Sequence, residues 1–181
     1  MSEYEGKIKY IEDNIRSYPD FPKQGILFRD IFSALAKGPV CKTLKDVIIA
    51  YIKTHCPHID CVVGLEARGF LFCMLIAAEL GIGCVPIRKK GKLPGKTASV
   101  SYQLEYGEDV FELQTDSIMP GQKVLVVDDL LATGGTMAAA VDLLQKVQAD
   151  VVQCLVVMEL KDLNGKDKVS VPVHSLITYC D

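Results

Sequence analysis

The sequence predicts an α/β fold in which a twisted, mostly parallel sheet is flanked by helices. After residue 60, short apolar segments alternate with segments whose apolar residues recur at helical spacing. Strands separated by helices in this way pair in parallel. The apolar segments are also continuous rather than alternating, which is typical of strands covered on both faces.

The length and composition indicate a globular chain with one core. Its 181 residues are 49% hydrophobic and 24% charged, and they contain no internal repeat and no evident linker. A chain of this length can bury a core of its own. We therefore predict a single domain over residues 1–181.

The N-terminal region carries two predicted helices. Apolar residues recur at helical spacing from Tyr4 to Ile15, and this helix should stop by Pro19 because proline disfavours helix in the residue before it. Residues 20–33 contain breakers and are expected to be irregular. A second amphipathic helix is predicted around residues 44–52.

The rest of the chain follows the strand and helix alternation. The predicted elements are a strand at 61–65, a helix at 70–80, strands at 83–87 and 123–127, a helix at 135–147 and a strand at 151–158. Residues 99–114 differ, because apolar and polar residues alternate there on both sides of a short polar break. This segment predicts a hairpin or a mobile flap.

Charge and hydropathy exclude several classes of protein. The net charge is −3 and the pI is about 5.6, so a generally basic nucleic-acid binder is excluded. No apolar stretch approaches the roughly 18 residues that cross a bilayer, and no signal-peptide core follows the N-terminus. Seven cysteines, several of them in apolar runs, favour free thiols and a reducing compartment. We expect a cytoplasmic protein without a membrane or nucleic-acid partner.

The most informative segment is residues 123–137, KVLVVDDLLATGGTM. It predicts an apolar strand that ends at two acids, then a glycine-rich turn, then a helix. Asp128 and Asp129 would stand at the carboxyl end of a parallel strand, where open α/β sheets place their ligands. The turn Ala132, Thr133, Gly134, Gly135 and Thr136 offers backbone N–H groups and hydroxyls to an anion at a helix N-terminus. The expected ligand is a phosphorylated sugar, although an acid pair alone can also merely end a strand and cap a helix.

This segment resembles the motif that binds 5-phosphoribosyl-1-pyrophosphate (PRPP) in type I phosphoribosyltransferases. Five further segments resemble the adenine-specific members of that family and occur in the family's order: RSYPDFP at 16–22, GILFRD at 25–30, GLEARGFLF at 64–72, RKKGKLPG at 88–95 and LEYG at 104–107. The resemblance implies the family fold with an N-terminal hood, about residues 1–35, and a flexible flap, about residues 92–110. It also implies that Asp128 and Asp129 hold the ribose hydroxyls and that residues 132–136 hold the 5′-phosphate.

Two other segments are implied to bind pyrophosphate. The turn Glu66, Ala67, Arg68 and Gly69 leaves a strand and enters a helix, so its N–H groups can cradle a phosphate; it can also be a plain connection. The run 88–96 holds five basic residues and no acid, which by itself often makes only a solvated face. The family uses such a run, here Arg88, Lys89 and Lys92, for pyrophosphate, and part of it reaches the neighbouring subunit. That implies a homodimer.

The resemblance also assigns the base and the chemistry. Phe28 would stack on adenine, and backbone groups of Leu27 and Arg29 would read its edge. Glu105 would handle the proton at the base nitrogen when the flap closes, with Tyr106 packing the closed flap. The implied reaction is adenine plus PRPP giving AMP and pyrophosphate, with Mg²⁺. Two alternatives stay open: a phosphoribosyltransferase for another base, and a non-catalytic regulator that senses PRPP.

Overall fold

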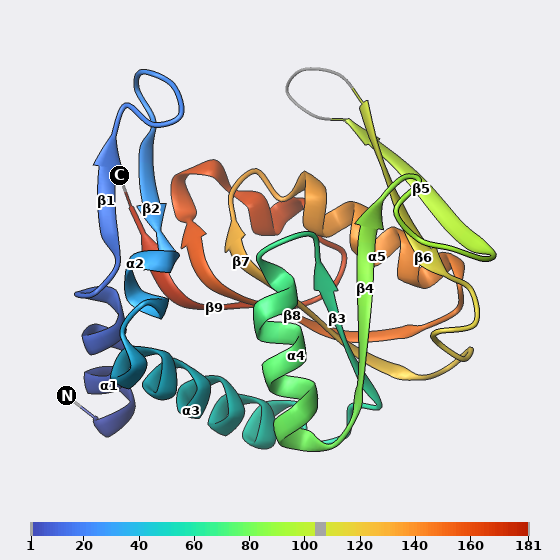
Figure 1. Cartoon of the computed structure of the whole chain (residues 1–181), viewed down its shortest axis with the longest axis horizontal. Coiled ribbons are helices and arrows are strands. Elements are labelled where there is room, and N and C mark those ends of the chain that lie inside the picture. The colour runs from blue at the N-terminus through green and yellow to red at the C-terminus, as the bar shows by residue number, and fades with distance from the viewer. Residues whose placement is uncertain (1, 104–107, 181) are drawn as a thin grey trace. The chain divides into compact units, whose positions relative to one another are not determined.

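The computed structural model describes residues 2–103 and 108–180 (Figure 1). The chain forms two compact units, Met1–His55 and Cys56–Asp181. The single domain expected from the sequence stays a prediction. Among the described residues, no helix is both long enough and apolar enough to traverse a bilayer.

The N-terminal unit consists of α1 (Glu3–Glu12), β1 (Arg16–Pro19), β2 (Leu27–Asp30), α2 (Ile31–Leu35) and α3 (Gly38–His55). Both predicted helices are present. A capping box starts α1, in which Ser2 and Glu5 exchange side-chain to backbone hydrogen bonds of 2.7 and 3.2 Å. Buried residues of α1 and α3 contribute to the packing of these two helices on each other.

The expectation of an irregular segment at residues 20–33 is wrong in part. β2 lies within it and pairs antiparallel with β1, and α2 follows directly. All four residues of β1 are exposed and β2 is at most half-buried. A hairpin that buries neither face has no alternation for a sequence pattern to reveal.

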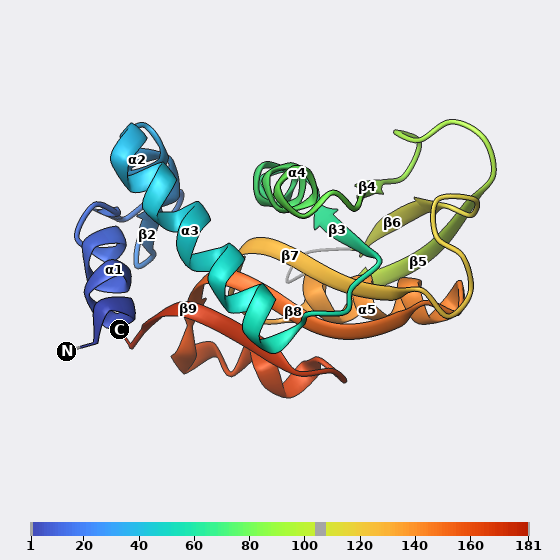
Figure 2. The same ribbon diagram turned by 90° about the horizontal axis from the view of Figure 1, so that it is seen from below.

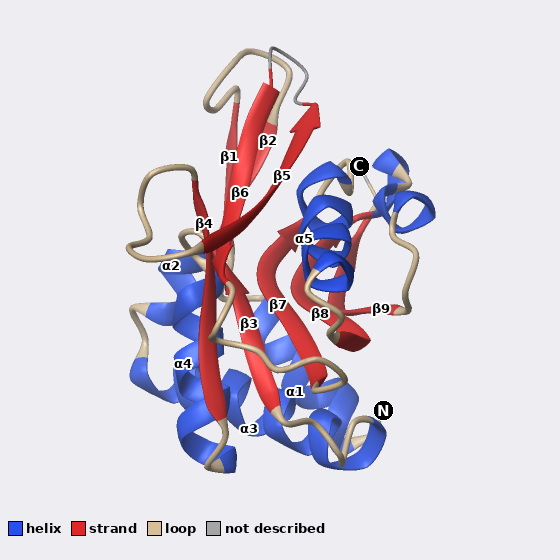
Figure 3. Cartoon of the chain, turned by 90° about the vertical axis from the view of Figure 1, so that its right-hand side faces the viewer, coloured by secondary structure: helices blue, strands red, loops and turns tan. Residues whose placement is uncertain are grey.

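The second unit contains a seven-stranded sheet in the order β5-β6-β4-β3-β7-β8-β9. Its strands are β3 (Cys61–Leu65), β4 (Gly83–Lys89), β5 (Thr97–Gln103), β6 (Glu108–Gln114), β7 (Lys123–Leu131), β8 (Asp150–Leu160) and β9 (Val173–Tyr179). The five strands from β4 to β9 in this order run parallel. The predicted hairpin, β5 with β6, joins antiparallel to β4 and extends that edge of the sheet (Figure 3).

Helices cover both faces of this sheet, as predicted. Figure 2 shows α4 (Gly69–Leu80) and α5 (Gly135–Lys146) on opposite sides of β3 and β7. Every residue of β3 is buried, and so are most residues of β7 and β8. Continuous apolar sequence therefore corresponds to strands covered from both sides. All seven cysteines are free thiols.

The strands differ from the prediction in length and in number. β4 and β7 continue past their expected ends, through Lys89 and Leu131. The C-terminal strand β9 was not predicted, and neither were the two short 3₁₀ helices Lys161–Leu163 and Gly165–Lys168. The short 3₁₀ helices are mostly exposed, so they lack the apolar periodicity on which the prediction depends.

Candidate active site

The acid pair lies inside β7 rather than after it. Asp128 pairs with Val156 in the ladder with β8, and the strand continues to Leu131. Asp129 is only 3% exposed. The expectation that the strand ends at residue 127 is therefore wrong, because neighbouring β8 continues the hydrogen-bonding ladder past the two acids.

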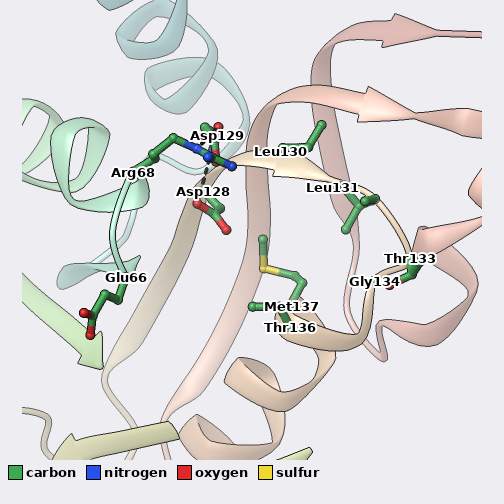
Figure 4. A pocket seen from close by; sticks show the side chains of 11 residues that line it. Glu66, Arg68, Asp128, Asp129, Leu130, Leu131, Thr133, Gly134, Thr136 and Met137 are labelled. Carbon is green, nitrogen blue, oxygen red and sulfur yellow. Dashed lines mark hydrogen bonds and ion pairs between the residues drawn. The ribbon is translucent and has the colours of Figure 1, made fainter. Parts of the chain in front are cut away.

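A cavity of about 240 Å³ opens beside this part of β7 (Figure 4). Its lining combines the acid pair, the glycine-rich turn, and two residues of the turn before α4. The lining residues are Glu66, Arg68, Asp128, Asp129, Leu130, Leu131, Ala132, Thr133, Gly134, Thr136 and Met137. The structure therefore brings together segments that lie about sixty positions apart in the sequence.

Arg68 links the turn to the acid pair. Its Nε donates a hydrogen bond of 2.5 Å to Oδ2 of Asp129, and Figure 4 shows the side chain reaching across to that carboxylate. Gly69 makes this approach possible. A Cβ at Gly69 would lie 2.8 Å from the carbonyl oxygen of Val127 and 3.1 Å from Oδ1 of Asp128. Any side chain there would push the turn away from β7.

The two adjacent carboxylates are electrostatically coupled. Burial, followed by the negative charge of Asp129, raises the pKa of Asp128 well above its usual value. The backbone N–H of Asp129 donates to Oδ1 of Asp128 over 2.9 Å, which offsets part of that rise. Asp128 therefore takes up a proton more readily than an ordinary aspartate and gains from any ligand that supplies hydroxyl donors or positive charge.

The glycine-rich turn is held in place by the segment after β8. Gly134 has φ +80°, and a Cβ on it would collide with the carbonyl oxygen of Gly165. Glycine is therefore required both by the backbone conformation and by the close approach. Within the described part of the chain, no side chain caps α5, which starts at Gly135. The N–H groups of its first turn are left for a ligand at this end of the cavity.

Acids pair with three residues of the basic run, residues 88–96. Arg88 donates to Glu66 through Nε at 3.2 Å and Nη2 at 3.3 Å, and Lys92 Nζ lies 2.6 Å from the same carboxylate. Lys89 Nζ lies 2.8 Å from Oδ2 of Asp109. Three of the five basic residues of the run are thus held in ion pairs.

The predicted residues fall into three groups. Most residues of the acid pair, the glycine-rich turn and the turn before α4 line one cavity, whereas Ala67, Gly69 and Gly135 are not among its lining residues. Arg88, Lys89 and Lys92 contact the lining residue Glu66. Leu27, Phe28 and Arg29 form part of β2 in the N-terminal unit, where Phe28 makes an edge contact with Phe21 at 5.0 Å between ring centroids. Glu105 and Tyr106 lie outside the described residues.

Some lining residues were not predicted. Leu130, Leu131 and Met137 add apolar surface to the cavity, and Gly165 supports the glycine-rich turn. The first three stand within or beside the motif, so their position alone could have suggested them. Gly165 carries no such signal, because only the folded chain brings it to Gly134.

Comparison with known proteins decides the family. Residues 40–176 match the profile of the phosphoribosyl transferase domain. The chain is 55% identical over 175 residues to an adenine phosphoribosyltransferase of Drosophila pseudoobscura pseudoobscura, covering 97% of each chain. It is 52% identical over 178 residues to that of Cricetulus griseus, covering 97% of this chain and 98% of the relative. This chain belongs to the adenine phosphoribosyltransferase family.

A solved structure extends the family likeness to the fold. Adenine phosphoribosyltransferase from Saccharomyces cerevisiae, complexed with adenine and an imino-altritol bisphosphate, superposes with a TM-score of 0.93 at 40% identity. The match covers 95% of this chain and 99% of that one. The resemblance inferred from the motifs and the predicted α/β fold are both confirmed for this member of the adenine phosphoribosyltransferase family.

Proposed function

We infer that the chain transfers the 5-phosphoribosyl group of PRPP to adenine, giving AMP and pyrophosphate, in purine salvage. This is the activity of a pentosyltransferase of the EC 2.4.2.7 type. The observation that carries it is an acid pair and a glycine-rich turn around one cavity, in a chain with the family's sequence over nearly its full length. The adenine in the Saccharomyces cerevisiae complex supports the choice of base.

The ribose 5-phosphate half of PRPP is assigned to β7 and the start of α5. Backbone N–H groups of residues 132–136 and the hydroxyls of Thr133 and Thr136 would hold the 5′-phosphate. Asp128 and Asp129 would accept hydrogen bonds from the ribose hydroxyls. The low exposure of Asp129 and the raised pKa of Asp128 support this assignment, because both groups gain from polar partners in a buried site.

The pyrophosphate half is assigned to the other side of the cavity. The turn Glu66, Ala67, Arg68 and Gly69 would offer backbone N–H groups, while Arg88, Lys89 and Lys92 would supply positive charge. The ion pairs of Arg88 and Lys92 with Glu66 place these cations next to that turn. Negative charge grows on the departing pyrophosphate, so these groups would stabilise the transition state.

The base and the closing segment complete the proposal. Phe28 would stack on adenine, with Leu27 and Arg29 reading the base edge through backbone groups. Glu105 would take the proton from the base nitrogen, and Tyr106 would pack over the closed site. Asp128 and Asp129 would place the ribose so that their negative charge faces the cationic carbon of the oxocarbenium-like transition state.

Magnesium fits this donor set. Among the described residues, no three His, Cys, Asp or Glu side chains converge on a possible metal position. Asp128 and Asp129 offer carboxylate oxygens, and Mg²⁺ often combines one or two carboxylates with substrate phosphates. When bound with PRPP, the ion would neutralise charge on the pyrophosphate. We propose that the protein residues orient the ribose and the anion around it.

We further propose a homodimer in the cytoplasm, with small molecules as the only other partners. Leu71 is 49% exposed and Met74 is 62% exposed on α4, close in sequence to Arg68. A second copy would cover this apolar surface and stand next to the pyrophosphate turn. Free thiols at all seven cysteines support a reducing compartment.

The test is an assay of the purified protein with radiolabelled base, PRPP and Mg²⁺. Adenine should give labelled AMP with equimolar pyrophosphate, and hypoxanthine should give far less product. Efficient turnover of hypoxanthine without turnover of adenine would favour another base. Binding of PRPP with no pyrophosphate release would favour the regulator.

A further inference from the structure

Glu66 is the acceptor for the charged groups of the basic loop, residues 88–92. Its carboxylate accepts hydrogen bonds from Arg88 Nε and Nη2, from Lys92 Nζ and from the backbone N–H of Lys89, at 2.6 to 3.3 Å. The side chain is 11% exposed. Burial alone raises the pKa of Glu66, but hydrogen bonds from Lys92, Arg88 and Lys89 outweigh it and lower the pKa to about 2. The group is therefore an anion at neutral pH.

These contacts use the same donors that would hold pyrophosphate. Glu66 occupies the Nε and Nη2 N–H groups of Arg88, and Nη1 donates to the carbonyl oxygen of Lys92 at 3.2 Å. A pyrophosphate can take the paired Nε and Nη2 donors of Arg88 only by replacing Glu66, and it competes with Glu66 for the charge of Lys92. Two cations around one carboxylate have a net charge of only +1. A pyrophosphate that arrives therefore meets a carboxylate of its own sign in the middle of its proposed binding site.

We propose that Glu66 is an internal counter-anion for the pyrophosphate site: it holds Arg88 and Lys92 in the free enzyme, releases them to pyrophosphate or to the diphosphate of PRPP, and takes them back when pyrophosphate leaves. The inference rests on the proposed function, since it needs Arg88 and Lys92 to bind pyrophosphate. Its consequence is kinetic as well as structural. The exchange keeps the basic loop ordered without ligand and weakens the hold on the product.

Neighbouring acids do not share this role. Glu112 also holds the loop, but it accepts from the backbone N–H of Gly91 at 2.8 Å and is only 8% exposed. Asp109 pairs with Lys89. Asp129 pairs with Arg68 but stands in the proposed ribose site. Among the described residues, Glu66 is thus the acid whose side chain joins both Arg88 and Lys92. Glu112 of β6, which contacts the same loop, provides a matched control.

The experiment titrates purified enzyme with pyrophosphate and Mg²⁺ in a calorimeter. Glu66→Gln keeps the shape but removes the charge, so we expect pyrophosphate to bind about tenfold more tightly. Glu66→Asp keeps the charge and should stay within about twofold of the wild type. Glu112→Gln should not tighten binding. The KM for PRPP should fall in Glu66→Gln without a rise in kcat.

Unchanged or weaker pyrophosphate binding in Glu66→Gln would overturn the proposal, and so would equal tightening in Glu112→Gln. Lys92→Met distinguishes failure of the counter-anion role from failure of the proposed function. If pyrophosphate affinity is unchanged in Lys92→Met, Lys92 does not bind the anion, and the assignment of the pyrophosphate site is itself wrong.

The wild type gives a test that does not depend on folding of Glu66→Gln. With ¹³C-labelled glutamate carboxyls, the Glu66 resonance, assigned with Glu66→Asp, should shift on adding pyrophosphate; an unmoved resonance contradicts the exchange.

Discussion

The two regions proposed to bind anions in this enzyme are built differently. The glycine-rich turn at residues 132–136 sits at the start of α5 and is fixed by the close approach of Gly134 to Gly165. The basic loop at residues 88–92 relies on side chains, and acids already hold them through ion pairs. The first region is neutral and preformed. The second is charged and must exchange partners to bind.

This difference matches the fate of the two phosphate groups in the reaction. The 5′-phosphate enters with PRPP and leaves with AMP, so it stays bound throughout the chemistry, and a rigid backbone site suits it. Pyrophosphate must be stabilised as it forms and must then be released. Side-chain cations with an internal partner suit that task, because the partner replaces the product.

The largest expected effect comes from the acid pair next to the preformed turn. Changing Asp128→Asn together with Asp129→Asn should lower kcat/KM by at least about a thousandfold, because the ribose loses both carboxylates near its cationic carbon. The protein should stay folded, since it loses a buried acid whose pKa is already raised. Steady-state kinetics and a thermal melt measure the two effects. Activity close to the wild type would mean that the motif does not hold the ribose.

The second effect tests the rigidity of the turn. Gly134→Ala should lower kcat/KM for PRPP about a hundredfold and destabilise the protein by roughly 2 to 3 kcal/mol, from the positive φ and the collision with Gly165. Gly121→Ala is the control, because Gly121 has φ +81° but open space around its Cβ position. It should cost about 1 kcal/mol and leave the KM for PRPP unchanged. A similar change in the KM for PRPP in both variants would show that the rigidity of the glycine-rich turn has no specific effect on PRPP binding.

The third effect separates the two regions by ligand. Lys92→Met should weaken pyrophosphate binding about tenfold by removing one cation, and it should leave ribose 5-phosphate binding unchanged. Calorimetry with each ligand in turn measures both constants. A loss of affinity for ribose 5-phosphate of the same size would show that the two regions are not independent.

The smallest effect concerns pH. The pKa of Glu66 is lowered to about 2 from a usual 4.5, so its ion pairs stabilise the folded state fully above pH 4.5 and lose that contribution as the pH falls toward 2. After solvent screening, we expect a loss of about 1 kcal/mol over this window. Denaturant titrations of the wild type and Glu66→Gln should converge at low pH. A constant difference between them would rule out this linkage.

The sequence predicted four of the five parallel strands, β3, β4, β7 and β8, for a physical reason. Residues 61–65 and 123–127 are continuous apolar runs because helices cover both faces of β3 and β7. The glycine-rich turn could be predicted because its glycines and threonines directly follow the apolar strand in the sequence. Both features depend on neighbours in the sequence.

The parts that were not predicted depend on distant residues. β1 is fully exposed and β2 is at most half-buried, so neither strand carries an alternating burial pattern. The pairing of Glu66 with Arg88 and Lys92 joins positions more than twenty residues apart. Charge alone favoured a solvated face for the basic run, because a local charge count cannot include an acid that follows another strand.

Hydrogen–deuterium exchange with each ligand alone tests the difference between the two regions most directly. The enzyme is incubated with ribose 5-phosphate, or with pyrophosphate and Mg²⁺, and peptides that cover residues 66–69, 88–92 and 132–136 are compared. We predict that ribose 5-phosphate protects residues 132–136 and leaves residues 88–92 unchanged, while pyrophosphate alters residues 66–69 and 88–92 and leaves the turn unchanged. Protection of residues 132–136 by pyrophosphate, with no change at residues 88–92, would contradict this account.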